Sequence, residues 1–304
     1  MGPLEKAIRE ISPLNEKVMR AARERQDSLT KPRGSLGRLE ELSIRVAGMR
    51  GELVPRLRRK AIVVMAADHG VVAEGVSLYP QEVTAQMVQN FLCGGAGINV
   101  LACLVGARVV VVDMGVAGEL EPHSALVSKK VALGTRNMMR GPAMSRAEAI
   151  NAIEAGLEIV AQEFEKGLDI IGTGDMGIGN TTPSSAITAA TTGELVAWVT
   201  GRGTGIGDKQ LTHKVRVIEE ALKVNQPNPR DGLDVLAKVG GFEIGGLVGV
   251  MIGAAAHHIP IVIDGFISGA AALIATRMAP NLGDFLIAAH VSTERGHRLA
   301  LKHL

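Results

Sequence analysis

The segment 172–183, which reads GTGDMGIGNTTP, constrains the fold of this chain more than any other feature. It follows the apolar run 168–171, which is typical of a buried strand. It ends in Thr182 and Pro183, a pair typical of a helix N-cap and first helical position. Glycine lets the backbone approach a ligand closely and adopt positive φ without steric cost. Because a strand, a glycine loop and a helix N-terminus aim backbone N–H groups at one point, the segment predicts a phosphate site.

A second glycine-rich segment, 201–208, reads GRGTGIGD and has glycine at every second position from Gly201 to Gly207. It lacks the Lys-Ser/Thr pair that follows the glycines of a Walker loop. A purely structural turn is the alternative interpretation of either loop. Two such loops in one chain argue against that alternative.

The first loop also matches the dinucleotide pattern GxGxxG at 172–177, with Glu194 following at a suitable distance. That pattern requires its third glycine inside the first turn of the helix. Here Asn180 and Pro183 place the helix start well past Gly177. A nicotinamide-dependent oxidoreductase therefore stays as a weaker alternative.

From residue 60 onward, apolar β-branched runs alternate with helical patterns. We expect strands at 61–67, 108–113, 168–171, 196–200 and 259–264, and buried helices at 245–256 and 268–278. Such alternation predicts an α/β fold with a Rossmann-like, mainly parallel sheet and helices on both faces. Ligands of such sheets bind at the carboxyl ends of the strands. Upstream, an amphipathic helix at 13–27 and a second one after residue 36 are expected.

Composition narrows the function classes. The chain has 304 residues, a net charge of +2 and 2% aromatic residues, which argues against a nucleic-acid partner. The apolar stretch 244–275 is interrupted by His257, His258 and Asp264, which are costly in lipid, so we expect no membrane segment. Cys93 and Cys103 lack zinc spacing, and the start has no secretory signal. A cytoplasmic protein without a metal or other cofactor is expected.

The segment 290–297, HVSTERGH, follows an apolar run and gathers His290, Ser292, Glu294 and His297 within eight residues. These side chains could form an acid–base cluster. The alternative is a capping turn, in which Ser292 or Thr293 caps a last helix and Glu294 complements the helix dipole. Spacing alone leaves both interpretations open.

An ordered set of motifs, running from about residue 30 to the C-terminus, is far more specific than any single loop. The motifs are 30–40 (TKPRGSLGRLE), 67–71 (ADHGV), 74–77 (EGVS), 79–84 (YPQEVT), 94–99 (GGAGIN), 177–182 (GIGNTT), 200–205 (TGRGTG), 240–244 (GGFEI), 264–266 (DGF) and 294–297 (ERGH). Together they resemble the nicotinate-nucleotide–dimethylbenzimidazole phosphoribosyltransferases, the enzymes of the cobalamin lower ligand.

The resemblance implies transfer of the phosphoribosyl group of nicotinate mononucleotide to 5,6-dimethylbenzimidazole, which yields α-ribazole 5′-phosphate and nicotinate. It also implies a homodimer and a small helical domain built from both chain ends. The corresponding division is 1–59 for N-terminal helices of the small domain, 60–285 for the large nucleotide-binding domain, and 286–304 for the C-terminal segment that carries the base.

The resemblance also implies the site residues. Glu294 is the expected catalytic base, and Asp175 is a second carboxylate where the family commonly has Glu. The expected nucleotide- and phosphate-binding residues are Gly174, Met176, Gly177, Gly179, Asn180, Thr181, Gly203, Lys214, Ser268 and Gly269. The expected pocket for the acceptor base is formed by Ser77, Tyr79 and Gln81.

The chemistry of this reaction needs little from the protein. Nicotinate departs as a neutral pyridine, so no general acid is required. The incoming azole must lose its N–H proton, for which one positioned carboxylate suffices. Attack opposite to the leaving base inverts the configuration at the sugar carbon, as in other one-step displacements. Other azoles, purines or phenols as acceptors, and a non-catalytic nucleotide-binding regulator, remain open at this point.

Overall fold

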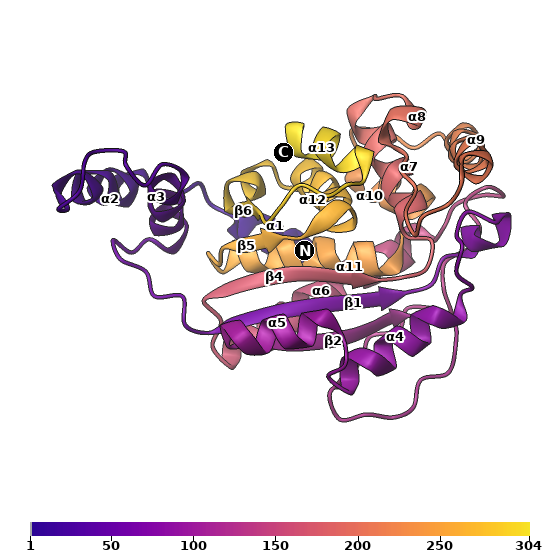
Figure 1. The fold of residues 1–304 in the computed structure, drawn as a ribbon, viewed down its shortest axis with the longest axis horizontal. Coiled ribbons are helices and arrows are strands. Elements are labelled where there is room, and N and C mark those ends of the chain that lie inside the picture. Colours follow the sequence, from indigo (N-terminus) through magenta and orange to yellow (C-terminus); the bar gives the residue numbers. More distant parts are fainter. Residues whose placement is uncertain (1) are drawn as a thin grey trace.

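The computed structural model describes residues 2–304 and centres on a six-stranded parallel sheet (Figure 1). The strand order is β3-β2-β1-β4-β5-β6, so the chain turns outward in opposite directions from the central pair β1 and β4. This is the doubly wound order of Rossmann-type folds, and it confirms the predicted α/β class. The strands are β1 (Lys60–Ala67), β2 (Ala107–Gly115), β3 (Leu126–Ser128), β4 (Ile170–Met176), β5 (Ile261–Ile263) and β6 (Leu286–Ala288).

Helices connect the strands and supply most of the remaining structure. They are α1 (Pro3–Glu10), α2 (Glu16–Ser28), α3 (Arg38–Arg50), η1 (Gly70–Glu74), α4 (Glu82–Leu92), α5 (Gly97–Val105), α6 (Arg146–Glu165), α7 (Thr181–Thr192), α8 (Val196–Val199), α9 (Asp208–Asn225), α10 (Gly232–Val239), α11 (Phe242–Ala256), α12 (Gly265–Met278), η2 (Pro280–Phe285) and α13 (Arg295–Lys302).

The two faces of the sheet are covered unequally. Helix α11 packs across β1, β2 and β4 and is itself backed by α6, which buries the main apolar core. Helices α4 and α5 lie on the opposite face, where α5 packs on β2 and α4 touches β1, β2 and β4. Beside them the sheet surface of β1, β4 and β5 stays open as an apolar groove of about 400 Å³.

The contact between α6 and α11 depends on glycine. A Cβ atom at Gly249 would collide with the backbone carbonyl of Ile153, and one at Gly156 would collide with the carbonyl of Gly246. The absence of side chains at these positions lets two helix backbones approach to direct contact. Along α11 the remaining side chains, such as Leu247 and Val250, are fully buried.

The chain ends occupy different places. Helices α2 and α3 pack on each other through Ala22, Ile44 and Ala47 and stand apart from the sheet at one end of the molecule (Figure 1). Helix α13 packs on α12, α7 and α8. The proposed division into 1–59, 60–285 and 286–304 stays a prediction.

Several expected elements are confirmed, including the helix–strand–helix succession α11, β5 and α12. The expected strand at 196–200 is wrong, because residues 196–199 form the short helix α8. Its Trp198 is 59% exposed, and the run lies outside the six-stranded sheet. A short apolar run carries too little periodicity to distinguish a strand from a helical turn.

The first glycine segment also needs correction. Strand β4 does not end at Ile171 but continues through Gly172, Gly174 and Asp175 to Met176, because these residues pair in register with β1. Helix α7 then begins at Thr181 with Asn180 as its N-cap, two residues earlier than expected. The actual loop is therefore only residues 177–180, and the first two glycines of the GxGxxG match lie inside a strand.

One stretch passes a length and composition test for a membrane-crossing helix. It spans Glu82–Val105, contains an 18-residue window with a mean hydropathy of 1.6, and corresponds to α4 and α5 taken together. In the structure these are two helices separated at Gly94, whose φ of +77° ends α4. The stretch is therefore broken into pieces too short to span a bilayer.

We expect Gly249→Ala to destabilise the fold, because its methyl group would force α6 and α11 apart. Overpacking of this kind costs about 1–3 kcal/mol, and we expect the upper part of that range. Thermal and denaturant unfolding measure the change. Gly97→Ala is the control, since a Cβ at Gly97 in α5 meets open space. Equal stability of the two variants would contradict the role assigned to the α6–α11 contact.

Candidate active site

The site is built where β1 and β4 end side by side. Ala66 pairs with Met176, so Asp68 and His69, which follow β1, lie next to the loop 177–180, which follows β4. These are the strands at which the sheet order reverses. In open α/β sheets, a crevice at this point is the usual place for a ligand.

A cavity of about 190 Å³ opens at this edge. It brings together most of the predicted nucleotide residues with one residue of the predicted acceptor pocket. Its lining consists of Val76, Ser77, Asp175, Met176, Gly177, Ile178, Gly179, Asn180, Thr181, Gly203 and Thr204. The two glycine loops thus meet in space.

Lys214 lies behind this cavity and connects the two loops. It extends from α9, is 1% exposed, and its Nζ donates a 2.6 Å hydrogen bond to Oγ1 of Thr181. A Cβ atom at Gly203 would lie only 2.8 Å from the same Thr181 oxygen. Burial lowers the pKa of Lys214 to about 8, although the charge of Glu294 opposes that shift. A cation therefore stands directly behind the N-terminus of α7.

Glu294 reaches the second glycine loop from the far end of the chain. It is half-buried at the N-terminus of α13, and its Oε1 accepts a 2.8 Å hydrogen bond from the backbone N–H of Gly203. Its Oε2 is buried and accepts no hydrogen bond from any group in residues 2–304. A Cβ atom at Gly201 would collide with this oxygen, so glycine is needed there. One carboxylate oxygen is anchored while the other is free to accept a proton.

The capping alternative for this segment is wrong, because Glu294 is the N-cap residue of α13 and no side chain caps the helix. The Ser292 hydroxyl accepts a 3.2 Å hydrogen bond from the backbone N–H of Glu294, and the Ser292 N–H donates to Nδ1 of His297. Ser292 thus shapes the turn. This leaves the Glu294 carboxylate directed at Gly203 rather than at the first turn of α13.

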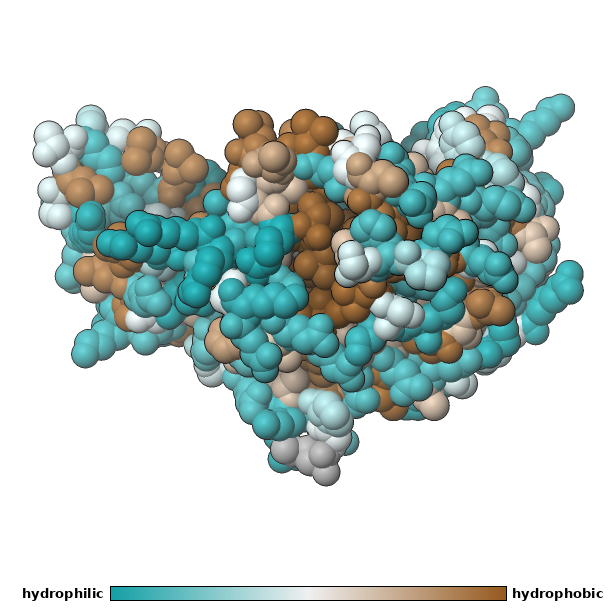
Figure 2. Space-filling model, turned by 90° about the horizontal axis from the view of Figure 1, so that it is seen from below, coloured by the Kyte–Doolittle hydropathy of each residue, from teal (hydrophilic) through white to brown (hydrophobic). Residues whose placement is uncertain are grey.

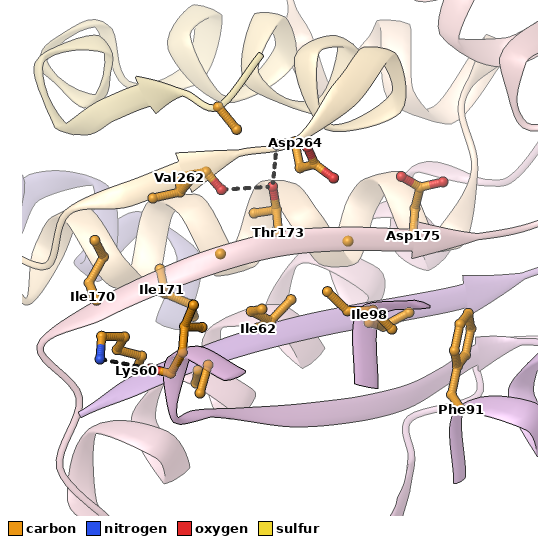
Figure 3. A pocket seen from close by; sticks show the side chains of 17 residues that line it. Lys60, Ile62, Phe91, Ile98, Ile170, Ile171, Thr173, Asp175, Val262 and Asp264 are labelled. Atoms are coloured by element: carbon orange, nitrogen blue, oxygen red, sulfur yellow. Dashed lines mark hydrogen bonds between the residues drawn. The ribbon is translucent and has the colours of Figure 1, made fainter. Parts of the chain in front are cut away.

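Asp175 lies at the end of β4, where the cavity and the apolar groove adjoin, and it lines both. Its Oδ1 accepts a 2.8 Å hydrogen bond from the Asn180 amide. Burial, and next the negative charge of Glu243, raise the pKa of Asp175 to about 7. Figure 3 shows its carboxylate above β4 together with Asp264, which adds to the same repulsion.

The other predicted site residues lie outside the cavity. Gly174 lines the groove instead, and Tyr79 and Gln81 follow Ser77 on the segment leading into α4. Ser268 is fully buried and receives a 2.9 Å hydrogen bond from the Thr173 hydroxyl. A Cβ atom at the neighbouring Gly269 would contact the ring of His297. Contact of these residues with a substrate stays a prediction.

Sequence reasoning missed a buried ion pair under the site. Nε2 of His69 lies 2.8 Å from Oε1 of Glu243, and the two side chains are 1% and 0% exposed. A lone histidine beside an apolar strand is typical of an ordinary core or edge position, so His69 by itself gives no signal. The signal that could have found the pair is Glu243, a carboxylate standing alone in the apolar run of α11.

Clustered metal ligands are not found in the described part of the chain. Within residues 2–304, no group of three or more His, Cys, Asp or Glu side chains is arranged to hold a metal ion. Independence from metals stays a prediction.

Comparison with known proteins agrees with this geometry. The family model described as "Phosphoribosyltransferase" matches residues 11–304. The nicotinate-nucleotide–dimethylbenzimidazole phosphoribosyltransferase of Desulforudis audaxviator (strain MP104C) is 61% identical, over all of this chain and 86% of the relative. The enzyme of the same name from Roseiflexus sp. (strain RS-1) is 59% identical over the same shares.

Solved structures give the same result. A crystal structure of CobT from Thermus thermophilus superimposes with a TM-score of 0.91 at 47% sequence identity, covering 94% of this chain and 86% of that one. The oxidoreductase alternative loses its support, because Gly172 and Gly174 of the GxGxxG match lie inside β4 rather than in the turn that this pattern requires. The chain therefore belongs to the family of nicotinate-nucleotide–dimethylbenzimidazole phosphoribosyltransferases.

Proposed function

We propose that this enzyme transfers the phosphoribosyl group of nicotinate mononucleotide to 5,6-dimethylbenzimidazole in cobalamin biosynthesis. The products are α-ribazole 5′-phosphate and nicotinate. The observation that carries the proposal is the meeting of both glycine loops with Lys214 and Glu294 at the reversal point of the sheet, in a chain of this family.

The 5′-phosphate is assigned to the loop 177–180 and the start of α7. The positive end of a helix favours an anion, and α7 is a twelve-residue helix that begins at the cavity. Lys214 adds a full positive charge behind Thr181. Its pKa is lowered by burial, which the charge of Glu294 only partly offsets, and a bound phosphate would further stabilise its charged form.

Glu294 is assigned as the general base. The anchored Oε1 fixes the carboxylate, and the unpartnered Oε2 is a ready acceptor for the N–H proton of the incoming azole. The azole nitrogen then attacks C1′ as the bond to nicotinate breaks, and the configuration inverts from β to α. Asp175 is assigned as a second carboxylate that orders the nucleotide or assists Glu294 electrostatically.

A homodimer in the cytoplasm completes the proposal. Helix α5 exposes Val100, Leu101, Leu104 and Val105, with Leu104 83% exposed, next to the open apolar groove. Figure 2 shows apolar side chains gathered in places on an otherwise hydrophilic face. Contiguous exposed apolar surface of this kind is typical of protein–protein contacts. The groove in Figure 3 runs from Lys60 to Asp175, so a partner seated there would adjoin the site.

The direct test is incubation with nicotinate mononucleotide and a panel of azoles, purines and phenols, followed by mass detection of the ribosylated product. We expect 5,6-dimethylbenzimidazole to give α-ribazole 5′-phosphate with release of nicotinate. Product from other bases only would change the acceptor but keep the reaction class. Absence of any ribosylated product would overturn the proposed function.

Glu294→Gln should keep the fold and nucleotide binding but lower turnover by about 10²–10⁴-fold, because the amide cannot accept the azole proton. Steady-state kinetics with the purified variant measures this loss, and circular dichroism checks the fold. Turnover close to wild type in a folded variant would remove Glu294 from the mechanism.

Asp175→Asn should lower activity less than Glu294→Gln, by about tenfold. The pKa of Asp175 near 7 means that the wild-type rate falls as pH drops through neutrality, because the carboxylate gains a proton. The variant lacks this group, so the acidic limb of its rate–pH profile should move to lower pH. Asp175→Glu should keep most activity. An unchanged profile in Asp175→Asn would make Asp175 a structural residue.

The raised pKa of Asp175 also makes the stability of the fold depend on pH. The pKa of Asp175 is raised from 3.8 to about 7 in the folded protein, so the folded state holds this proton more tightly than the unfolded state. The stability that this contributes is fully present below pH 3.8 and is lost as pH rises through about 7. Asp175→Asn should therefore gain stability relative to wild type above neutral pH.

Leu104→Glu should dissociate the proposed dimer, because it buries a charge in an apolar contact. Light scattering after size-exclusion chromatography measures the mass, for which the chain alone is 31.9 kDa. Phe164→Glu is the control, because Phe164 is also an exposed apolar residue but lies outside the lining of the groove. A wild-type protein that runs as a monomer at micromolar concentration would contradict the dimer.

A further inference from the structure

We propose that His69 and Glu243 are a positioning pair for the first glycine loop, so that nucleotide binding depends on an ion pair that never touches the substrate. The inference rests on the assignment of the loop 177–180 to the 5′-phosphate. Neither His69 nor Glu243 lines the cavity.

The pair sits directly beneath the loop. His69 follows β1, and Glu243 stands in the first turn of α11, so the contact links the central strand to the helix that covers it. The ring is held between two glycines. A Cβ atom at Gly177 would lie 3.1 Å from Nε2 of His69, and one at Gly241 would lie 2.5 Å from Cε1. The backbone of the loop therefore rests on the imidazole with no side chain in between.

A second contact fixes the loop from the other side. The backbone N–H of Ile178 donates a 3.1 Å hydrogen bond to Oγ1 of Thr84 on α4, and that bond is fully buried. Between this anchor and the His69 ring, Gly177 has no room to shift without displacing one of them. A movement of the His69 ring would therefore displace the backbone of the loop 177–180, to which the phosphate is assigned.

Electrostatics keeps the ring in place. Burial alone would lower the pKa of His69, but the carboxylates of Glu243, Asp68 and Asp175 outweigh it, and the pKa lies above its ordinary value. Among residues 2–304, neither ring nitrogen and neither oxygen of Glu243 has a hydrogen-bond partner. The contact is thus held by charge, and removal of one partner leaves a buried charge unpaired.

The decisive variants are Glu243→Gln and the double variant His69→Gln/Glu243→Gln. Glu163→Gln is the matched control, because Glu163 is also a buried carboxylate, 3% exposed and paired with Arg108, but at the opposite end of the strands. The measurements are calorimetric affinity for inorganic phosphate, KM for each substrate, kcat and thermal unfolding.

We expect Glu243→Gln to weaken phosphate binding and raise the KM for nicotinate mononucleotide together, each by about tenfold, while the KM for 5,6-dimethylbenzimidazole changes less than about twofold. Glu163→Gln should lower stability and leave all three values unchanged. The double variant should regain stability, since no unpaired charge remains, but keep the weak phosphate affinity. If Glu243→Gln does not fold, the double variant gives the same answer.

Two outcomes would overturn the proposal. One is wild-type phosphate affinity in folded Glu243→Gln. The other is a double variant whose affinity recovers together with its stability, which would make the pair structural only. Failure of the wild-type enzyme to make α-ribazole 5′-phosphate would overturn the proposed function. The phosphate affinities could still be compared in that case, because calorimetry with phosphate needs no turnover.

The pH dependence of stability gives an independent readout. The raised pKa of His69 contributes stability that is fully present below about pH 6.5, its unfolded value, and is lost as pH rises through the folded value. Asp68, Asp175 and Glu243 are the charged groups that face the ring. The difference in Tm between wild type and Glu243→Gln should therefore shrink as pH rises above about 6.5. A difference that grows over this range would contradict a charged His69.

Discussion

The parallel pairing of β1 with β4 is the interaction on which the rest of this structure depends. Seven residue pairs, from Lys60 with Ile170 to Ala66 with Met176, hold the two strands in register at the centre of the sheet. Because the chain leaves this pair in opposite directions, the loops that follow the two strands diverge and leave a crevice between them. This register brings His69 next to Gly177 and places Asp175 near the end of β4, where it lines the cavity.

The glycines of this chain act mainly as places of close approach. Gly172 and Gly174 belong to β4. Because they have no side chains, the apolar groove forms over this part of the sheet. Gly201 makes room for the Glu294 carboxylate, and Gly249 makes room for a neighbouring helix. The local sequence pattern predicts a loop for the segment 172–183. It cannot distinguish a glycine that is needed for a turn from a glycine that leaves room within a strand. The deciding factor is pairing with a strand more than a hundred residues away.

Local sequence patterns do not show long-range pairing, and this explains which parts of the fold and of the site could be predicted. The alternation of apolar runs and helices indicates the α/β class and the central strands, because each such element is decided by its own periodicity. The edge strands β3 and β6 have three residues each and give too short a signal. The contact between Gly203 and Glu294 spans 91 residues and follows from no spacing rule. The spacing of 290–297 indicated a possible acid–base cluster, but only the resemblance to a family singled out Glu294 as the base. The pair of His69 with Glu243 was missed because each residue alone has an ordinary explanation.

Charge is distributed unevenly around the cavity, and the proposed substrate carries its charges in a matching way. Lys214 and the N-terminus of α7 supply positive charge at Thr181, where the phosphate is assigned. Asp175, with Asp264 and Glu243 nearby, supplies negative charge at the end of β4. Nicotinate mononucleotide carries a phosphate at one end and, at the other, a pyridinium ring with a cationic nitrogen bonded to C1′ and a carboxylate on the ring. Since that cation is lost when nicotinate departs, carboxylates placed near it would hold the substrate more tightly than the product base, and His69 limits how much negative charge accumulates there.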